Sequence, residues 1–240
     1  MKKLVILGSL CLGFFILANP ARGHDLWLYT PHFYFSPGET VNLKICFGHN
    51  FPHDDLIIPP ESLSPFVVLS PSGKKFTVHD LEPHPLSKKP RSRKGFVLAR
   101  FTPPEEGVYV VGTARVRRGT PEQVPSGKYA KAIIVVGQNL KGSFTEPLGY
   151  RLEIIPLKNP ALIKPGEELP VRIMFDGKPL STFVYATYAG YWSEKEPFPV
   201  ITRSDARGIA RIKIARPGVW MVVCNHRVDF SASLTFEVRD

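Results

Sequence analysis

The chain has 240 residues, 43% of them hydrophobic, and its 31 basic side chains outnumber the 21 acidic ones for a formal net charge of +10. This length is enough for one large domain or two small ones with real hydrophobic cores. The densest basic run, residues 88–94, is broken by proline and has no aromatic residue for base stacking, so the charge does not indicate a nucleic-acid-binding protein. We expect a solvated loop there, with anionic lipid or an acidic partner as the alternative contact.

The first 23 residues have the pattern of a secretory signal peptide. A basic start at residues 1–3 precedes an apolar run at residues 4–18, which is too short to predict a membrane span. Ala21 and Gly23 supply small residues at the −3 and −1 positions of a cleavage before His24. We therefore predict a periplasmic protein that begins at His24, whereas a competing cleavage five residues earlier would leave His24 inside the chain.

Turn residues divide the first half of the chain into short apolar segments. No stretch has a convincing helical period, and 24 prolines and 19 glycines interrupt the sequence throughout. Five segments have the alternation or apolar character of strands, at residues 40–47, 66–70, 96–101, 108–116 and 131–136. Short strands at this spacing are typical of a β-sandwich.

The second half repeats this plan after a polar, glycine-containing stretch. Its predicted strands are residues 150–155, 169–175, 183–188, 209–214 and 219–224. The turn segments 176–180, 204–208 and 216–220 resemble those of transthyretin-like sandwiches. We predict an all-β protein with two tandem immunoglobulin-like or transthyretin-like β-sandwich domains, residues 24–137 and 150–240, joined by a linker at 138–149.

Two cysteines follow the predicted signal peptide, Cys46 and Cys224. Export to an oxidising compartment allows a disulfide between them. Both lie in apolar, strand-like runs, so two buried free thiols are the alternative.

Candidate metal ligands occur in three segments. If His24 is the first residue, its α-amino and imidazole nitrogens form a bidentate chelate that suits Ni²⁺ or Cu²⁺. His49, His53 and Asp54 follow a predicted strand, and His226 stands at the end of another. Strand ends gather at the poles of a sandwich, so we expect His24, His49 and His226 to converge on one metal ion, with His53 or Asp54 as an auxiliary group.

Each histidine also has an ordinary interpretation. A single histidine at a strand end is often a surface or hydrogen-bonded residue, which applies most directly to His226. The spacing of His49 and His53 is not the helical zinc-protease motif, because no glutamate follows His49 and Pro52 interrupts the segment. The remaining histidines are expected to be solvated, and they are His32, His79 and His84.

Signatures of catalysis are missing from the sequence. It has no nucleophile elbow, no phosphate-binding loop and no Cys-x-x-Cys motif. The tryptophans at 27, 192 and 220 could form a sugar-binding platform, but each lies in an apolar run, so we expect core packing. A binding protein is therefore favoured over an enzyme.

Several segments together resemble the NikM-like family, also called NikK-like, of exported proteins found beside nickel and cobalt transporters. The resemblance rests on residues 24–28, 47–54, 128–132, 147–149, 176–180, 217–220 and 233–237. It implies a periplasmic protein that binds Ni²⁺ or Co²⁺ as cargo and supplies a membrane transporter. The family's functional residues fall on His24, Asp25, Trp27, His49 with the nearby His53 and Asp54, and His226.

Two other functions fit parts of the same pattern. A terminal histidine with a second histidine on a β-sandwich also describes a copper-binding histidine-brace oxidase. A metal-free envelope interaction module, in which the histidines are incidental, is the other alternative. The sequence thus predicts metal binding first, with nickel or cobalt as cargo and copper as the competing metal.

Overall fold

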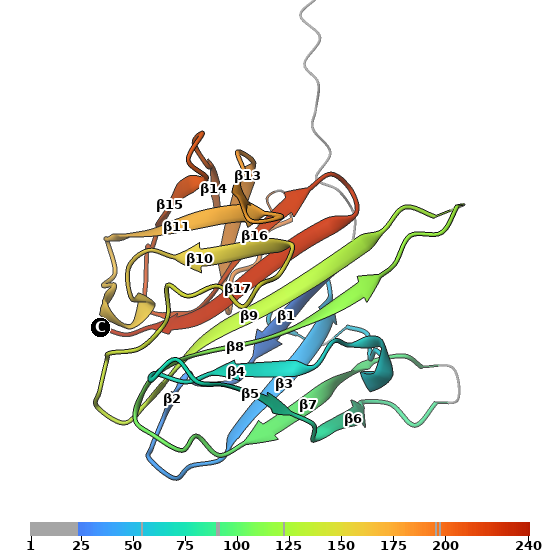
Figure 1. Ribbon diagram of the computed structural model, residues 1–240, viewed down its shortest axis with the longest axis horizontal. Coiled ribbons are helices and arrows are strands. Elements are labelled where there is room, and N and C mark those ends of the chain that lie inside the picture. The colour runs from blue at the N-terminus through green and yellow to red at the C-terminus, as the bar shows by residue number, and fades with distance from the viewer. Residues whose placement is uncertain (1–23, 54, 90–91, 122, 195, 197) are drawn as a thin grey trace, which may run out of the picture.

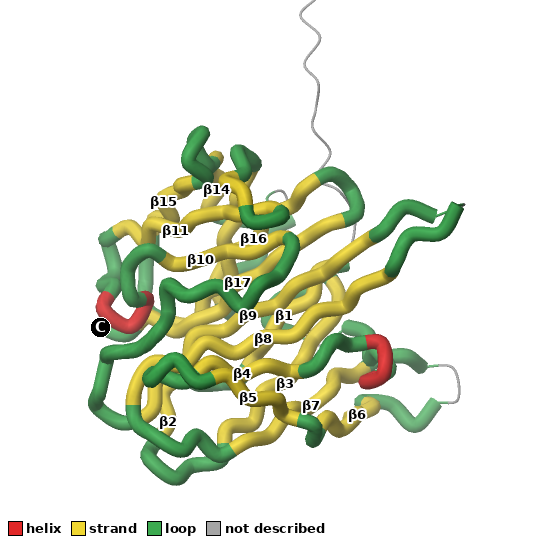
Figure 2. The backbone as a smooth tube through the Cα atoms, viewed as in Figure 1, coloured by secondary structure: helices red, strands yellow, loops and turns green. Residues whose placement is uncertain are grey.

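The computed structural model describes residues 24–53, 55–89, 92–121, 123–194, 196 and 198–240 (Figure 1). The predicted signal peptide and Asp54 lie outside these residues. Figure 2 shows that strands make up most of the described chain and that its helical segments are short. The predicted all-β class is confirmed.

The strands follow apolar segments bounded by turn residues, as the alternation predicts. In the first half they are β1 (Asp25–Tyr29), β2 (Tyr34–Phe35), β3 (Val41–Gly48), β4 (Phe66–Leu69), β5 (Lys75–Val78), β6 (Leu81–Pro85), β7 (Gly95–Phe101), β8 (Gly107–Arg117) and β9 (Ser126–Val136). In the second half they are β10 (Leu152–Pro156), β11 (Glu168–Phe175), β12 (Lys178–Pro179), β13 (Phe183–Tyr188), β14 (Val200–Arg203), β15 (Ile209–Lys213), β16 (Gly218–His226) and β17 (Phe230–Val238). Two short 3₁₀ helices are η1 (Pro60–Ser62) and η2 (Pro160–Leu162).

A nine-stranded sheet forms the middle of the molecule. Its strand order is β14-β13-β16-β17-β9-β8-β4-β5, and β2 pairs with β9. Figure 1 shows the long strands β8, β9, β16 and β17 side by side through the centre. Two smaller sheets accompany it: one has the order β1-β3-β7-β6, and the other contains β10, β11, β12 and β15.

The smaller sheets cover opposite faces of the central sheet, and β9 shows the alternation that this requires. Ala132 and Ile134 pack in one core with residues of β1, β3 and β7. Ile133 and Val135 pack in a second core with residues of β10, β11 and β15. Because both faces are covered, β8 and β9 are buried over most of their length.

The two halves of the chain are not separate sandwiches. Residues 138–149 do run between the last strand of the first half and the first strand of the second. However, β17 pairs in parallel with β9, from Phe230 opposite Gly127 to Thr235 opposite Ala132. This pairing joins strands of both halves into one sheet, so the structure does not confirm the predicted division into two tandem domains.

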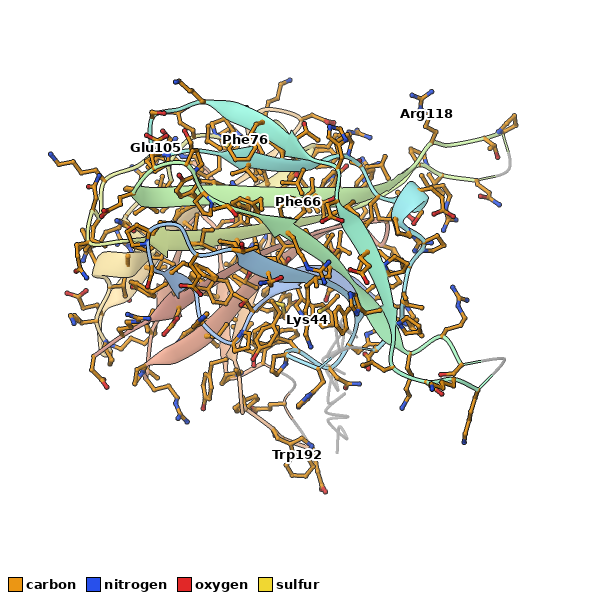
Figure 3. The ribbon with its side chains drawn as sticks, turned by 90° about the horizontal axis from the view of Figure 1, so that it is seen from below. Lys44, Phe66, Phe76, Glu105, Arg118 and Trp192 are labelled. Atoms are coloured by element: carbon orange, nitrogen blue, oxygen red, sulfur yellow. The ribbon has the colours of Figure 1, made fainter. Side chains whose placement is uncertain are left out.

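Buried side chains answer two questions that the sequence left open. Cys46 and Cys224 are both buried and are not joined by a disulfide, so the alternative to a disulfide between them is the one observed. Trp27 and Trp220 are core residues, with exposed fractions of 1% and 0%. Trp192 is 78% exposed and projects from the body of the molecule in Figure 3, so its predicted core packing is wrong.

No described helix is long and apolar enough to cross a membrane.

Candidate functional site

The pairing of β1 with β3 brings His24 next to His49. In this antiparallel pair Asp25 lies opposite Gly48, so the residues just beyond them, His24 and His49, are neighbours at the same end. The two imidazole ring centroids are 4.3 Å apart with an interplanar angle of 30°. Phe47 supports the pair, because its ring stacks on His24 with a centroid distance of 5.1 Å. Two of the three predicted ligand segments therefore meet.

Asp55 holds the loop that carries His49. Its carboxylate accepts hydrogen bonds from the backbone N–H of His49 at 2.6 Å, from the backbone N–H of Asn50 at 3.2 Å and from the Asn50 side-chain amide at 2.7 Å. Burial raises the pKa of Asp55, but these hydrogen bonds outweigh it and leave the pKa below its usual range. The carboxylate is thus ionised at neutral pH and fixes the direction in which the chain leaves β3.

The surroundings of His24 favour its neutral form. Burial lowers the pKa of His24, and the neighbouring positive charge of protonated His49 lowers it further. Asp55 and Asp25 act in the opposite direction with smaller effect. A neutral imidazole is the form that binds a metal ion, so this arrangement favours the ligand form near neutral pH.

Replacing His49 by alanine should raise the pKa of His24 towards its ordinary value of 6.5, because the like charge is removed. The rise should be partial, since burial, the larger cause, remains. Titration of the His24 imidazole by NMR in both proteins measures the change. The control variant His79→Ala, at an exposed position, should leave the His24 pKa where it is. An unchanged pKa in His49→Ala would show that the two rings do not interact in solution.

Asp25 and Lys128 lie beside the histidines. Burial raises the pKa of the Asp25 carboxyl, while Lys128 and a hydrogen bond with Ser231 act against the rise. Burial lowers the pKa of Lys128, and Asp25 and Asp229 oppose that change. Both side chains are thus partly withdrawn from water close to the two imidazoles.

His226 does not join this group. Its ring lies against Phe175 of β11, with a centroid distance of 4.2 Å. On β16, Cys224 shares the face of His226 and packs in the core beneath β10 and β11, whereas Val223 packs against Trp27 of β1. His226 is therefore on the opposite face of the central sheet from His24. The three segments therefore do not converge as predicted, because the alternation of side chains along β16 places His226 on the face that points away from β1.

Of the two auxiliary ligand candidates, His53 and Asp54, only His53 lies within the described residues. His53 is exposed, and its backbone N–H donates to the carbonyl of Asn50 at 2.6 Å in the turn after His49. Asp54 lies outside the described residues. Asp55, which the sequence analysis did not single out, orders the loop instead.

The described residues contain no group of three or more histidine, cysteine, aspartate and glutamate side chains arranged to hold a metal ion. His24 and His49 offer two imidazoles, and cleavage before His24 would add its α-amino nitrogen. The rings partly face each other, so directing one nitrogen of each to a common ion requires rotation about the side-chain torsions. His49 is exposed and His24 is only partly buried, which leaves room for this rotation.

Comparison with solved structures finds distant likenesses. The D0-D1 domains of intimin are 16% identical, with 90% of this chain and 98% of that chain covered and a TM-score of 0.28. Salmonella alpha-2-macroglobulin reacted with methylamine is 14% identical with a TM-score of 0.29, and the match covers 97% of this chain but only 16% of that chain. Domains 5-6 of the S-layer protein SbsC are 12% identical, with 90% and 97% covered and a TM-score of 0.26.

Comparison with curated protein sequences finds no match. A comparison with protein-family models matches residues 21–228 to a domain of unknown function, DUF4198. This match spans most of the sequence and includes the strands β1 to β16, whereas β17 lies beyond its end. The protein therefore belongs to the DUF4198 family.

Proposed function

We propose that this protein binds one transition-metal ion in the periplasm, with Ni²⁺ or Co²⁺ as cargo for a membrane transporter. The ligands are the α-amino and imidazole nitrogens of His24 and the imidazole of His49. The transporter and the periplasmic location rest on the predicted signal peptide and on the NikM-like resemblance. The observation that carries the metal site is the 4.3 Å separation of the ring centroids of two imidazoles, one just before β1 and the other just after β3.

The donor set and its surroundings support this proposal. Amine and imidazole nitrogens suit borderline metals, and a set of three such nitrogens suits tetragonal Ni²⁺ or Cu²⁺. Asp55 fixes the backbone of His49 by hydrogen bonds, as supporting groups around metal ligands do. The lowered pKa of His24 keeps its imidazole neutral to lower pH than an ordinary histidine. The α-amino group has an ordinary pKa of about 7.7–8.0 and must lose its proton to bind, so metal affinity should already fall as the pH drops below about 8.

Calorimetric titration with Ni²⁺ and Co²⁺ tests the proposal on proteins that begin at His24. The unaltered protein should bind about one ion per chain, and one extra alanine before His24 should weaken binding at least about tenfold, roughly 1.4 kcal/mol. His49→Ala should cause a loss of the same order because it removes another ligand. The matched control His79→Ala should bind as the unaltered protein does.

Two results would contradict the proposal. Equal binding by the unaltered and extended proteins would show that the His24 amine is not a ligand. A lack of saturable binding of any metal would favour the metal-free interaction module, with the histidines incidental.

Copper is the second candidate, and the position of His226 is the observation that favours it. With His226 on the other face, the ligands that remain are one amine and two imidazoles, the set of a histidine brace. Divalent copper binds such a site more tightly than nickel or cobalt by the general order of metal affinities. Peroxide formation by the Cu²⁺-loaded protein with ascorbate, abolished in His49→Ala, would support a copper-dependent oxidase over a carrier.

A further inference from the structure

Like charges face each other on the strands next to the histidine pair. In the β8–β9 pairing Arg115 lies directly opposite Lys128. Directly opposed like charges destabilise a sheet, so the stability of the sheet does not explain why these two residues stand opposite each other. Arg93 and Arg117 add to the repulsion: after burial, they are what lowers the pKa of Arg115. Four cationic side chains thus gather at this end of the central sheet.

The Phe47 ring contacts both the basic group and the histidine pair. The Arg115 guanidinium lies over the Phe47 ring, with Cζ 5.0 Å from the centroid. The same ring stacks on His24 with a centroid distance of 5.1 Å. Lys128 is close enough to His24 to contribute to the lowering of its pKa. The basic group and the imidazole pair therefore border one another.

Acidic groups only partly offset these charges. Asp25 and Asp229 act on Lys128. Asp55 already accepts hydrogen bonds from His49 and Asn50, which direct its oxygens to the loop. Within the described part of the chain, neither Arg115 nor Lys128 has a carboxylate oxygen within the 4.0 Å of an ion pair, unlike the paired Lys131. Among the described residues, the Arg115 guanidinium therefore has no carboxylate partner beside the histidines.

This charge pattern repels a bare divalent cation and attracts an anion. A guanidinium fork binds carboxylates by paired hydrogen bonds, and carboxylates also ligate borderline metals. A small polycarboxylate bound to a metal ion would satisfy both parts of the surface at once. Its metal ion would be ligated by the imidazoles, and one of its free carboxylates would bind Arg115 and Lys128.

We infer that the site takes its metal as an anionic complex with a small carboxylate chelator, held by Arg115 and Lys128 beside His24 and His49. This inference rests on the proposed metal-binding function and names the form in which the metal arrives. The metal ion contributes the contacts to nitrogen, and the chelator contributes the negative charge that the basic group attracts.

Titrations with Ni²⁺ alone and with Ni²⁺ premixed with citrate test the inference on the protein that begins at His24. The unaltered protein should bind the citrate complex at least about tenfold more tightly than Arg115→Gln does, while Ni²⁺ alone should bind the two proteins within about twofold. Lys128→Gln should lose part of the same gain. Arg115→Lys keeps the charge without the fork and should give an intermediate affinity.

Arg118→Gln is the matched control, because Arg118 lies farther along the same hairpin and points away from the body of the molecule (Figure 3). It should bind the citrate complex as the unaltered protein does. Circular dichroism checks that each variant is folded, and Lys128→Gln serves as the test if Arg115→Gln is not.

Three results would overturn the inference. Citrate that weakens Ni²⁺ binding equally in the unaltered and Arg115→Gln proteins acts only as a competitor, and the proposed function then stands because Ni²⁺ alone still binds. An equal gain from phosphate in place of citrate would show a general oxyanion site with no need for a chelator. If neither Ni²⁺ nor its citrate complex binds, the inference and the proposed function fail together.

Discussion

A glutamine in place of Glu153 should lower the free energy of unfolding by about 3–5 kcal/mol, which is the usual cost of breaking a buried ion pair by removing one charge. Glu153 lies in β10, and its carboxylate is 2.8 Å from the ammonium of Lys131 in β9. Both side chains are almost completely buried, at 3% and 2% exposure. The substitution leaves the Lys131 charge without its partner in a low-dielectric interior.

The same carboxylate also holds the backbone before β10. It accepts hydrogen bonds from the N–H groups of Leu148, Gly149 and Tyr150 at 2.7, 3.1 and 3.1 Å. A glutamine has one oxygen and one NH₂ group, so at least one of these donors would face another donor. The loss of stability should therefore come from the backbone that leads into β10 as well as from the broken ion pair.

Urea unfolding of the two proteins measures the difference. Glu168→Gln is the matched control, because its partner Arg211 lies 4.0 Å away in an exposed pair, and it should change stability by less than about 1 kcal/mol. Lys131→Met combined with Glu153→Gln should recover part of the loss, since it removes the unpaired ammonium and keeps one side-chain oxygen to accept from the backbone. A loss below about 1 kcal/mol in Glu153→Gln would show that the ion pair is not what joins these strands.

Gly48→Ala should displace the loop that carries His49 and weaken Ni²⁺ binding at least about tenfold. A Cβ atom at Gly48 would lie 2.2 Å from both Cβ and Oδ2 of Asp55, which no real contact permits. Asp55 would have to move, and its hydrogen bonds to His49 and Asn50 would be lost. Overpacking of this kind also costs about 1–3 kcal/mol of stability. Calorimetry and urea unfolding measure the two effects.

A double-mutant comparison separates the clash from a general effect of the alanine. Asp55→Gly removes the atoms that the new methyl group would meet, at the cost of the loop hydrogen bonds. Adding Gly48→Ala to Asp55→Gly should then cost much less than adding it to the unaltered protein. Equal costs in both backgrounds would place the effect of the alanine elsewhere.

Local sequence patterns predicted the class of fold and many of its strands. Residues 183–188 form β13 as expected, and the strands predicted at 96–101 and 169–175 differ from β7 and β11 by one residue at the start. These segments have turn residues on both sides and apolar side chains on a regular period, so short-range information is sufficient. The strands that were not predicted are β1, β2, β5, β6, β12, β14 and β17. All of them except β17 have five residues or fewer, which is too short for a clear period.

The pairing of strands that lie far apart in the chain could not be predicted from local sequence patterns. Both halves have the composition of a sandwich, and nothing local shows that β17 pairs in parallel with β9. The same limit applies to the candidate site. His24 and His49 flank strands that pair as neighbours, so their meeting follows from strand ends gathering together. The side taken by His226 depends on the register of β16 against β17 and on the sheet that covers it, which pattern alone does not give.

The central position of β17 has a consequence for the order in which the protein becomes functional. The Ser233 hydroxyl donates to the carbonyl of Leu26 at 2.7 Å, and the Thr235 hydroxyl donates to the carbonyl of Leu28 at 2.8 Å. The strand that follows His24 is thus held by residues more than two hundred positions later. Contacts of such separation form late and cooperatively. If the chain is exported as we propose, His24 and His49 would cross the membrane before they are brought together. The proposed metal capture would then begin only after β17 had crossed and folded.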